Sequence, residues 1–496
     1  MKNKTIRPTF HDFLSGFFVF LLAMPLSLGI AKASNFPPLM GLLTAGIGGL
    51  VVSWFSGSRL SIKGPAAGLI VIVAGSVTEL GKGDPVQGWI LTSGVLFLSA
   101  ILQLGFGKMK LGRFIDFFPL PSIQGMLSAI GIIILSKQVH LILGNSPLDA
   151  EGNPLIEPIE LLMAIPDSLN NINHISTIIG LIGMTIVLTW HRMPIAFLRK
   201  FPAPLIVLLM TIPLSMVLKL PKEQTIQFQQ NFFDSIRFQL DFSGWENFGI
   251  FIKYILLFAI IGSLESLLTV RAVDIQTPKE PKSNPNKDLI SIGFGNILSS
   301  FFGGLPMISE VARSSANVSS GAKTHWSSFF HGFFILLFLV FSVHFSGFIP
   351  TAALSALLVA VGIRLINPKE FFKIFKLGKE QFLVFISTII MTLFTDLLIG
   401  ISMGILVNIG FLYFNGTPLQ RIFRPKLHWK GNVLMVDEAA TFANWLGIQK
   451  EINTKKRSEH IVIDFSNCSI MDQTVQENVF HLGVEFSKSG GSLISR

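Results

Sequence analysis

One carboxylate, Glu265, lies inside an apolar stretch that reads Ile261-Gly262-Ser263-Leu264-Glu265-Ser266-Leu267-Leu268-Thr269. An ionised group there costs roughly 3 kcal/mol or more unless it is paired, protonated or hydrated. Thr269 follows one helical turn later, so both side chains share a face. The pattern predicts that Glu265 and Thr269 hold a coupling ion, either H⁺ or Na⁺. A structural hydrogen bond between helices is the alternative.

Two basic residues occupy similar surroundings. Arg313 would point its guanidinium into the membrane interior and attract an anion directly. Glu310 lies one turn away on the same face, so an ion pair that only fixes packing is the alternative. Lys63 precedes Gly64-Pro65, and it could join an anion site, pair with Glu265, or extend into a cytoplasmic vestibule.

Gly/Pro breaks interrupt the apolar chain at Gly64-Pro65 and at Gly303-Gly304-Leu305-Pro306. Proline favours the first turn of a helix, so the ranges 64–79 and 306–321 are predicted to be half-helices that start within the membrane. Two facing helix N-termini would bind an anion through their backbone amides. The candidate amides belong to Ala66, Ala67, Gly68, Met307, Ile308 and Ser309.

These residues require apolar elements to position them. Half of the 496 residues are hydrophobic and only 14% are charged, which excludes an ordinary soluble domain. The apolar runs predict an all-α polytopic membrane protein. Its fourteen predicted segments are 11–34, 38–56, 64–79, 86–106, 117–138, 174–191, 201–219, 249–271, 288–302, 306–321, 324–346, 350–364, 380–396 and 398–416.

The two breaks occur at matching places in the chain. Pro65 follows Pro25 of the first segment by 40 residues, and Pro306 follows Glu265 of the eighth by 41. This correspondence predicts an inverted repeat of seven plus seven segments. Paired interrupted segments are typical of the binding site in secondary transporters.

The basic residues gather in alternate loops, which argues against a nucleic-acid surface and gives a topology. The predicted location is the cell (inner) membrane, with multiple passes and both termini in the cytoplasm. The basic clusters are Lys108, Lys110 and Arg113; Arg192, Arg199 and Lys200; Lys279, Lys282 and Lys287; and Arg364, Lys369, Lys373, Lys376 and Lys379. The stretch 138–191 has no Lys or Arg but contains Asp149, Glu151, Glu157, Glu160 and Asp167.

The chain changes character after the last apolar segment. Residues 421–496 hold ten Lys/Arg and eight Asp/Glu, so they are predicted to be a soluble cytoplasmic domain that follows a transport domain over 1–420. Strands over 433–436 and 461–465 and a helix over 473–487 predict an α/β fold. A single cysteine and the absence of nucleotide and zinc motifs predict no metal, no cofactor and no enzyme activity.

The sequence resembles the SulP family of anion permeases, relatives of the solute carrier 26 proteins. The resemblance rests on Ala23-Met24-Pro25, Phe36 to Leu42, Gly57-Ser58-Arg59, Gly64 to Gly68, Leu264 to Leu268 and Gly303 to Thr324. It implies a core and a gate domain, elevator-like alternating access, homodimers within the lipid membrane, and a C-terminal STAS domain. The family's anion site would fall on Ala66, Ala67, Ser309 and Arg313, with Glu265 at the coupling position.

The chain departs from the family at Leu26, at Lys63, and at Asp472-Gln473-Thr474-Val475, where STAS domains usually have Asp-Ser-x-Gly.

The predicted function is secondary active transport of a small inorganic anion, sulfate or bicarbonate, coupled to H⁺ or Na⁺. A dicarboxylate symporter and an uncoupled anion channel are the alternatives.

Overall fold

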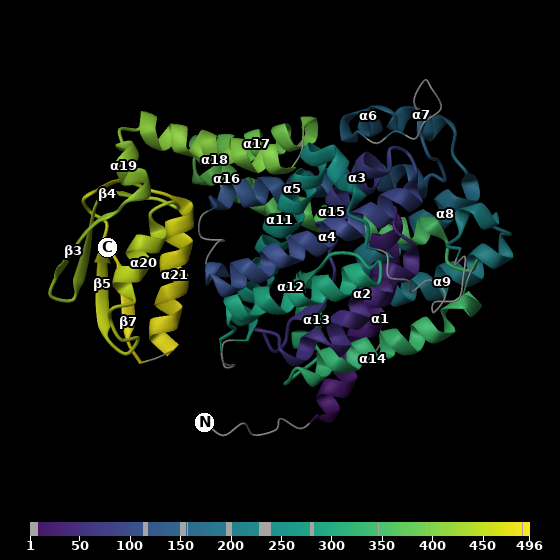
Figure 1. Cartoon of the computed structure of the whole chain (residues 1–496), viewed down its shortest axis with the longest axis horizontal. Helices are drawn as coiled ribbons and strands as arrows, with labels where there is room; N and C mark the ends of the chain where they lie inside the picture. The colour runs from purple at the N-terminus through teal and green to yellow at the C-terminus, as the bar shows by residue number, and fades with distance from the viewer. Residues whose placement is uncertain are drawn as a thin grey trace. The chain divides into compact units, whose positions relative to one another are not determined.

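A computed structural model describes residues 8–112, 118–148, 155, 157–194, 201–227, 240–277, 282–345, 347–395, 397–488 and 490–496. The chain divides into two units, the first formed by Met1–Gly112 and Ile130–Leu365 and the second by Arg113–Ala129 and Ile366–Arg496 (Figure 1). Several residues of the charge pattern, Arg113, Asp149, Glu151, Arg199, Lys200 and Lys279, lie outside the described residues.

The first unit is built from apolar helices. They are α1 (Phe10–Ala33), α2 (Pro38–Leu50), α3 (Ile70–Gly81), α4 (Pro85–Lys108), most of α5 (Leu120–Ile142), α6 (Pro158–Met163), α7 (Ile165–Asn170), α8 (His174–Thr189), α9 (Ala203–Val217), α11 (Phe248–Gln276), α12 (Pro285–Phe301), α13 (Val311–Ser319), α14 (Trp326–Phe341) and α15 (Thr351–Ile366). In the described part of the chain, six helices are long and apolar enough to cross a membrane. The count of fourteen crossings stays a prediction.

The start of α1 ties two distant parts of this unit together. Thr9 and Asp12 form a capping box, in which Thr9 N donates to Asp12 Oδ2 and Asp12 N donates to Thr9 Oγ1. Asp12 also accepts hydrogen bonds of 2.9 Å from the backbone amides of Lys323 and Thr324. The turn after α13 is therefore anchored on the first turn of α1.

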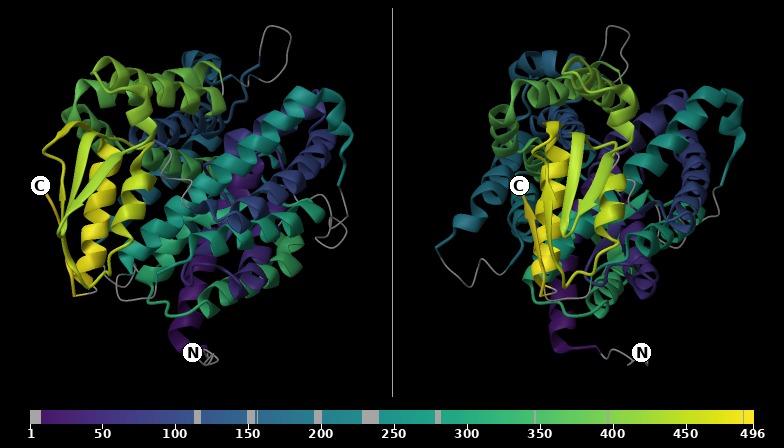
Figure 2. Two further views of the ribbon diagram at one scale, coloured as in Figure 1. Left: turned by 60° about the vertical axis from the view of Figure 1, so that its left-hand side comes forward. Right: turned by 90° about the vertical axis from the view of Figure 1, so that its left-hand side faces the viewer.

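Helices α1, α2 and α14 pack along one another (labelled in Figure 1; further views in Figure 2). Gly49 of α2 and Gly332 of α14 make the closest approach. A β-carbon added to Gly332 would lie 2.6 Å from Leu50 N. Small residues at this crossing let the two backbones touch, which is how helices associate within a membrane.

Two short strands replace the predicted half-helix starts. Strand β1 (Ile62–Pro65) pairs antiparallel with β2 (Met307–Glu310). The extended approach through Gly64-Pro65 is confirmed, but the prediction that helices begin at Pro65 and Pro306 is wrong, because α3 begins at Ile70 and α13 at Val311. Pairing with each other gives the two breaks backbone partners that an apolar environment does not supply.

The second unit contains the start of α5, then α16 (Pro368–Leu377), α17 (Lys379–Phe394), α18 (Leu397–Phe414) and α19 (Leu419–Phe423). An α/β fold follows, with β3 (Lys426–Lys430), β4 (Val433–Ala440), α20 (Trp445–Ile452), β5 (His460–Asp464), β6 (Cys468–Met471), α21 (Gln473–Lys488) and β7 (Ser492–Ser495). The predicted strands and helix are present. The boundary at 420/421 stays a prediction.

The sheet of this α/β fold has the order β3-β4-β5-β7, with β6 beside β4. Strand β3 is antiparallel to β4, whereas β5, β6 and β7 pair in parallel. Helices α20 and α21 lie on the same side of the sheet (Figure 1). Trp445, Ile448 and Phe486 are fully buried against it, so this part has its own hydrophobic core.

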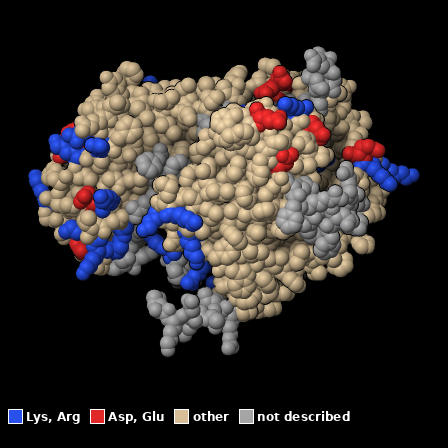
Figure 3. All heavy atoms as spheres, viewed as in Figure 1, with Lys and Arg blue, Asp and Glu red and all other residues tan. Residues whose placement is uncertain are grey.

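Uncharged residues cover most of the molecular face drawn in Figure 3, and charged side chains occur there only in separate groups. Large apolar side chains are also exposed on the helices, among them Leu181 of α8, Leu209 of α9 and Leu337 of α14. A soluble protein rarely exposes so much apolar surface, whereas lipid requires it.

Candidate functional site

The β1–β2 pair is the backbone of the candidate site. Its register places Lys63 opposite Ser309, Gly64 opposite Ile308 and Pro65 opposite Met307. Residues that face each other across an antiparallel pair project to the same side. The register therefore decides which predicted residues can act together.

Arg313 is the third residue of α13. It is fully buried, and its Nε, Nη1 and Nη2 atoms have no hydrogen-bond partner among the described residues. Its Nε lies 3.9 Å from Glu310 Oε2, which instead caps α13 by accepting from Arg313 N at 2.7 Å. A β-carbon on Gly64 would collide with Arg313 Nη1, so the glycine leaves the room that the guanidinium occupies.

Glu265 comes from the middle of α11 and lies against Gly68, where a β-carbon would collide with its Oε1. Its side chain is 7% exposed, and Oε1 has no hydrogen-bond partner in the described part of the chain. Thr269 Oγ1, one turn further along α11, is also buried without a partner. Glu265 thus lies beside the first break, and Thr269 follows it on α11, while their role in binding a coupling ion stays a prediction.

Lys63 makes a contact that the sequence did not predict. Its Nζ lies 2.8 Å from Asp288 Oδ1 on α12, and both side chains are fully buried. It also donates to Ser56 Oγ and Ser61 Oγ. The suggested pair with Glu265 is wrong, because Asp288 provides a nearer carboxylate on the face of β1 that Lys63 occupies.

Ser309 is held from two sides. Its backbone N donates to Ser266 Oγ at 3.0 Å, next to Glu265 in α11, and its Oγ donates to Asp288 Oδ2 at 2.9 Å. Ser309 thus links α11 to the Lys63–Asp288 pair. Its amide is already engaged, which differs from the prediction of an unpaired helix N-terminus.

The amides of the second break are satisfied by a polar network. Met307 N donates to Asn296 Oδ1 at 2.5 Å, and Asn296 Nδ2 donates to Met307 O and to Gln103 Oε1. Met307 and Ile308 belong to β2, so their predicted role as helix-terminal donors is wrong. Ala66, Ala67 and Gly68 do lie between β1 and the start of α3, beside Glu265.

Sequence reasoning missed Asp288, Asn296, Gln103 and His331. The first three are polar residues within predicted apolar segments, and that signal was available because such residues usually face the interior of a bundle. His331 of α14 is fully buried, neither ring nitrogen has a partner among the described residues, and an electrostatic interaction links it to Arg313.

The two buried cations of the site, Lys63 and Arg313, differ in their partners. Lys63 is neutralised by Asp288, whereas the guanidinium of Arg313, beside Gly64 of β1, has donors without hydrogen-bond partners among the described residues. Such donors suit a small anion with oxygen acceptors. Among the described residues, no group of three His, Cys, Asp or Glu side chains could hold a metal ion.

Two paired breaks beside a buried arginine whose guanidinium donates no hydrogen bond within the described residues are features expected of a polytopic anion transporter. The chain belongs to the sulfate permease family, whose sequence profile matches residues 10–388. The resemblance to SulP proteins is thereby confirmed, and the protein is a transmembrane anion transporter of this family.

Named relatives agree with this assignment. The putative sulfate transporter YvdB of Bacillus subtilis is 26% identical over 422 residues, which cover 84% of this chain and 76% of the relative. The bicarbonate transporter BicA of Picosynechococcus sp. is 25% identical over 402 residues, which cover 80% of this chain and 69% of that protein.

Solved structures share the fold. The transmembrane domain of a cyanobacterium bicarbonate transporter BicA matches with a TM-score of 0.69 and 24% identity, over 79% of this chain and 97% of that one. Murine Slc26a9 in the inward-facing state matches with a TM-score of 0.71 and 17% identity, over 100% of this chain and 86% of that one.

Proposed function

We propose that this protein performs secondary active transport of a small inorganic anion, sulfate or bicarbonate, coupled to H⁺ or Na⁺ through Glu265. The observation that carries the proposal is Arg313, a fully buried guanidinium whose three nitrogens lack hydrogen-bond partners among the described residues. A buried cation of this kind is costly unless a ligand with oxygen acceptors uses its donors. The names of the two relatives support sulfate and bicarbonate as the first substrates to test.

Glu265 supports the coupling step. Its Oε1 lacks a partner within the described chain, and electrostatic repulsion from Glu310 acts on it. A bound proton or Na⁺ would neutralise the carboxylate, and this would lower the cost of burial when the anion enters. Coupling would then follow because the empty and the fully loaded sites are both better tolerated than a half-loaded one.

The proposal also covers the transport mechanism, the oligomeric state, the membrane topology and the C-terminal domain. They are elevator-like alternating access between core and gate, a homodimer, cytoplasmic termini at the cell membrane, and a STAS-like role for residues 421–496. The family assignment and the likeness in fold support them.

Uptake of labelled sulfate or bicarbonate into proteoliposomes tests the site. We expect Arg313→Ala to lower the apparent affinity for the transported anion by about 10- to 100-fold, the value of one or two hydrogen bonds to an ionised group. The matched control is Arg192→Ala, which removes an exposed arginine. An unchanged uptake curve in Arg313→Ala for every anion tried, including dicarboxylates, would contradict the assignment.

The same vesicles test the coupling. We expect Glu265→Gln to abolish accumulation driven by a pH or Na⁺ gradient while it leaves anion exchange measurable, because glutamine cannot gain or lose the charge. Gradient-driven accumulation at the wild-type level would contradict a coupling role. Currents that ignore both gradients and saturate only at high anion concentration would identify a channel instead.

A further inference from the structure

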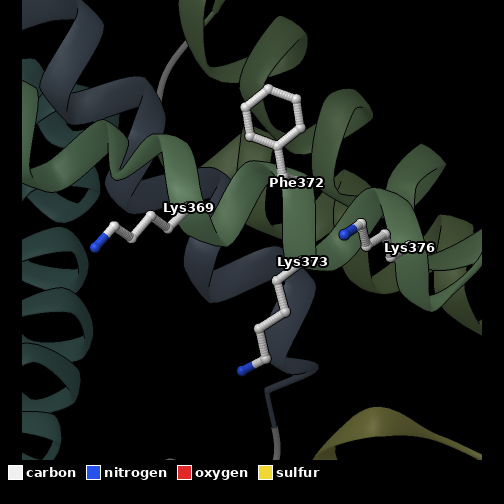
Figure 4. A pocket seen from close by; sticks show the side chains of 4 residues that line it. All are labelled: Lys369, Phe372, Lys373 and Lys376. Carbon is white, nitrogen blue, oxygen red and sulfur yellow. The ribbon is translucent and has the colours of Figure 1, made fainter.

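Helix α16 is a short basic helix between α15 and α17. Lys369, Lys373 and Lys376 follow one another at spacings of four and three residues, so they share one face. All three are exposed. Figure 4 shows their side chains together with Phe372.

The apolar residues of α16 pack only partly against the protein. Ile374 is fully buried, and the ring of Phe371 lies 5.4 Å from that of Phe382 on α17. By contrast, Phe372 is 63% exposed and Phe375 is 61% exposed. The helix therefore has an anchored side, an exposed aromatic side and a lysine side. Helices of this kind lie in a membrane interface, with apolar rings towards the acyl chains and lysines towards the headgroups.

A shallow hollow of about 370 Å³ is lined by Lys369, Phe372, Lys373 and Lys376. Its charge is strongly positive, because residues 364–380 contain five Lys or Arg and two Asp or Glu. One of the two acids, Glu380, accepts a hydrogen bond of 2.8 Å from Asn415. Three lysines and an aromatic side chain that line the same hollow suit a phosphate that is joined to an apolar tail.

We propose that α16 binds the headgroup of an anionic phospholipid, with its phosphate at Lys369, Lys373 and Lys376 and its acyl chain against Phe372 and Phe375. A free phosphate ion would use the lysines but would leave the exposed parts of both rings uncovered. This site lies outside the proposed anion-transport site and does not depend on it.

The lipid site shares one residue with the C-terminal α/β fold. Lys373 Nζ lies 3.2 Å from Glu477 Oε1 on α21, and the two side chains are 50% and 37% exposed. Exposed ion pairs of this kind are weak, so an anionic headgroup competes effectively for Lys373. Lipid binding therefore releases one contact between α16 and α21, which makes the attachment of the C-terminal fold depend on the lipid composition.

Native mass spectrometry of the detergent-purified full chain, titrated with phosphatidylglycerol, tests the site. We expect the wild type to retain phosphatidylglycerol more tightly than phosphatidylcholine. The variant Lys369→Gln/Lys376→Gln should bind phosphatidylglycerol about 30-fold more weakly, since each lysine near an anionic lipid contributes about fivefold. Its retention of phosphatidylcholine should not change.

The matched control is Lys450→Gln/Lys456→Gln, which removes two exposed lysines of the α/β fold and should leave phosphatidylglycerol binding unchanged. Equal weakening in both double variants, or none in either, would overturn the proposal. So would displacement of phosphatidylglycerol by inorganic phosphate at equal concentration. Glu477→Gln should strengthen phosphatidylglycerol binding several-fold because it removes the carboxylate that competes with the headgroup for Lys373, and an unchanged affinity would overturn the shared use of that lysine.

Discussion

Arg313 and Lys63 are both fully buried cations, but the protein uses them in opposite ways. Lys63 is surrounded by Asp288 and serine hydroxyls, so its charge is compensated within the structure. Arg313 keeps its donors for another partner. This difference makes Lys63 a positioning residue, which fixes β1 on α12 and so sets where Gly64 and the guanidinium meet.

Removing one partner of the Lys63–Asp288 pair should destabilise the protein. We expect Lys63→Met to cost about 3 to 5 kcal/mol, because the carboxylate of Asp288 is left buried without its counter-charge. Lys63→Met/Asp288→Asn should recover part of this loss. Unfolding in detergent under increasing denaturant measures both. If Lys63→Met weakened anion affinity without loss of stability, Lys63 would belong to the binding site instead.

Asp472 is a buried carboxyl at the start of α21, outside the membrane segments. Burial raises its pKa from the ordinary value of 3.8 to about 7, although the backbone amides of Val475 and Phe442 donate to it and oppose the shift. The folded state therefore binds the proton more tightly than the unfolded state. Stability from this group is complete below about pH 4 and decreases as the pH rises to about 7.

This linkage gives a pH-dependent prediction. Between pH 5 and pH 7 the α/β fold should lose up to about 1.4 kcal/mol of stability per pH unit. Asp472→Asn should flatten that dependence, because an amide does not titrate. Thermal unfolding of both full-length proteins at pH 5.5, 6.5 and 7.5, followed by tryptophan fluorescence, measures the slopes. Parallel slopes in the two proteins would show that another group controls the effect.

At the scale of elements, the crossing of α2 and α14 depends on two glycines in backbone contact. The nearest atom to a β-carbon on Gly49 would be a backbone atom of Gly332, at 2.6 Å. Backbone cannot move aside as a flexible side chain can. The two helices must separate if either glycine gains a large side chain.

We expect Gly332→Leu to lower the unfolding midpoint in detergent, with a loss of about 1 to 3 kcal/mol or more, as overpacking usually causes. Gly410→Leu is the matched control, since it lies in α18 and a β-carbon there would meet nothing within 4 Å. Equal midpoints for the two variants would mean that the α2–α14 crossing is less tight than the structure shows.

The sequence predicted the positions of the helices better than it predicted which distant residues pair with each other. Apolar runs and the Gly64-Pro65 break predicted the helices and the extended approach, because hydropathy and proline chemistry are local. The pairing of β1 with β2, and of Lys63 with Asp288, joins residues far apart in the chain. One sequence contains no information on which distant polar residues meet, so Glu265 was considered as the partner of Lys63.

At the scale of the whole molecule, the sequence indicated which residues of the candidate site are unusual but not which distant residues they contact. Arg313 and Glu265 were identified because each is an ionisable residue in an apolar segment. The roles of Met307 and Ile308 were wrong because strand pairing displaced the helix starts. Gly68 was predicted as an amide donor to the anion, and the structure places it against Glu265, a neighbour that the sequence did not indicate.

The β1–β2 pair also has a consequence for how the protein is made. Ile62 N donates to Ser314 Oγ across 252 residues of chain. At 5 to 20 residues per second, a ribosome needs about 10 to 50 s to add that length. During this interval β1 has no partner strand, so its backbone groups need other hydrogen-bond partners, in water or in protein, until β2 is made. The β1–β2 pair is therefore completed late in synthesis, when the second half of the protein reaches the bilayer.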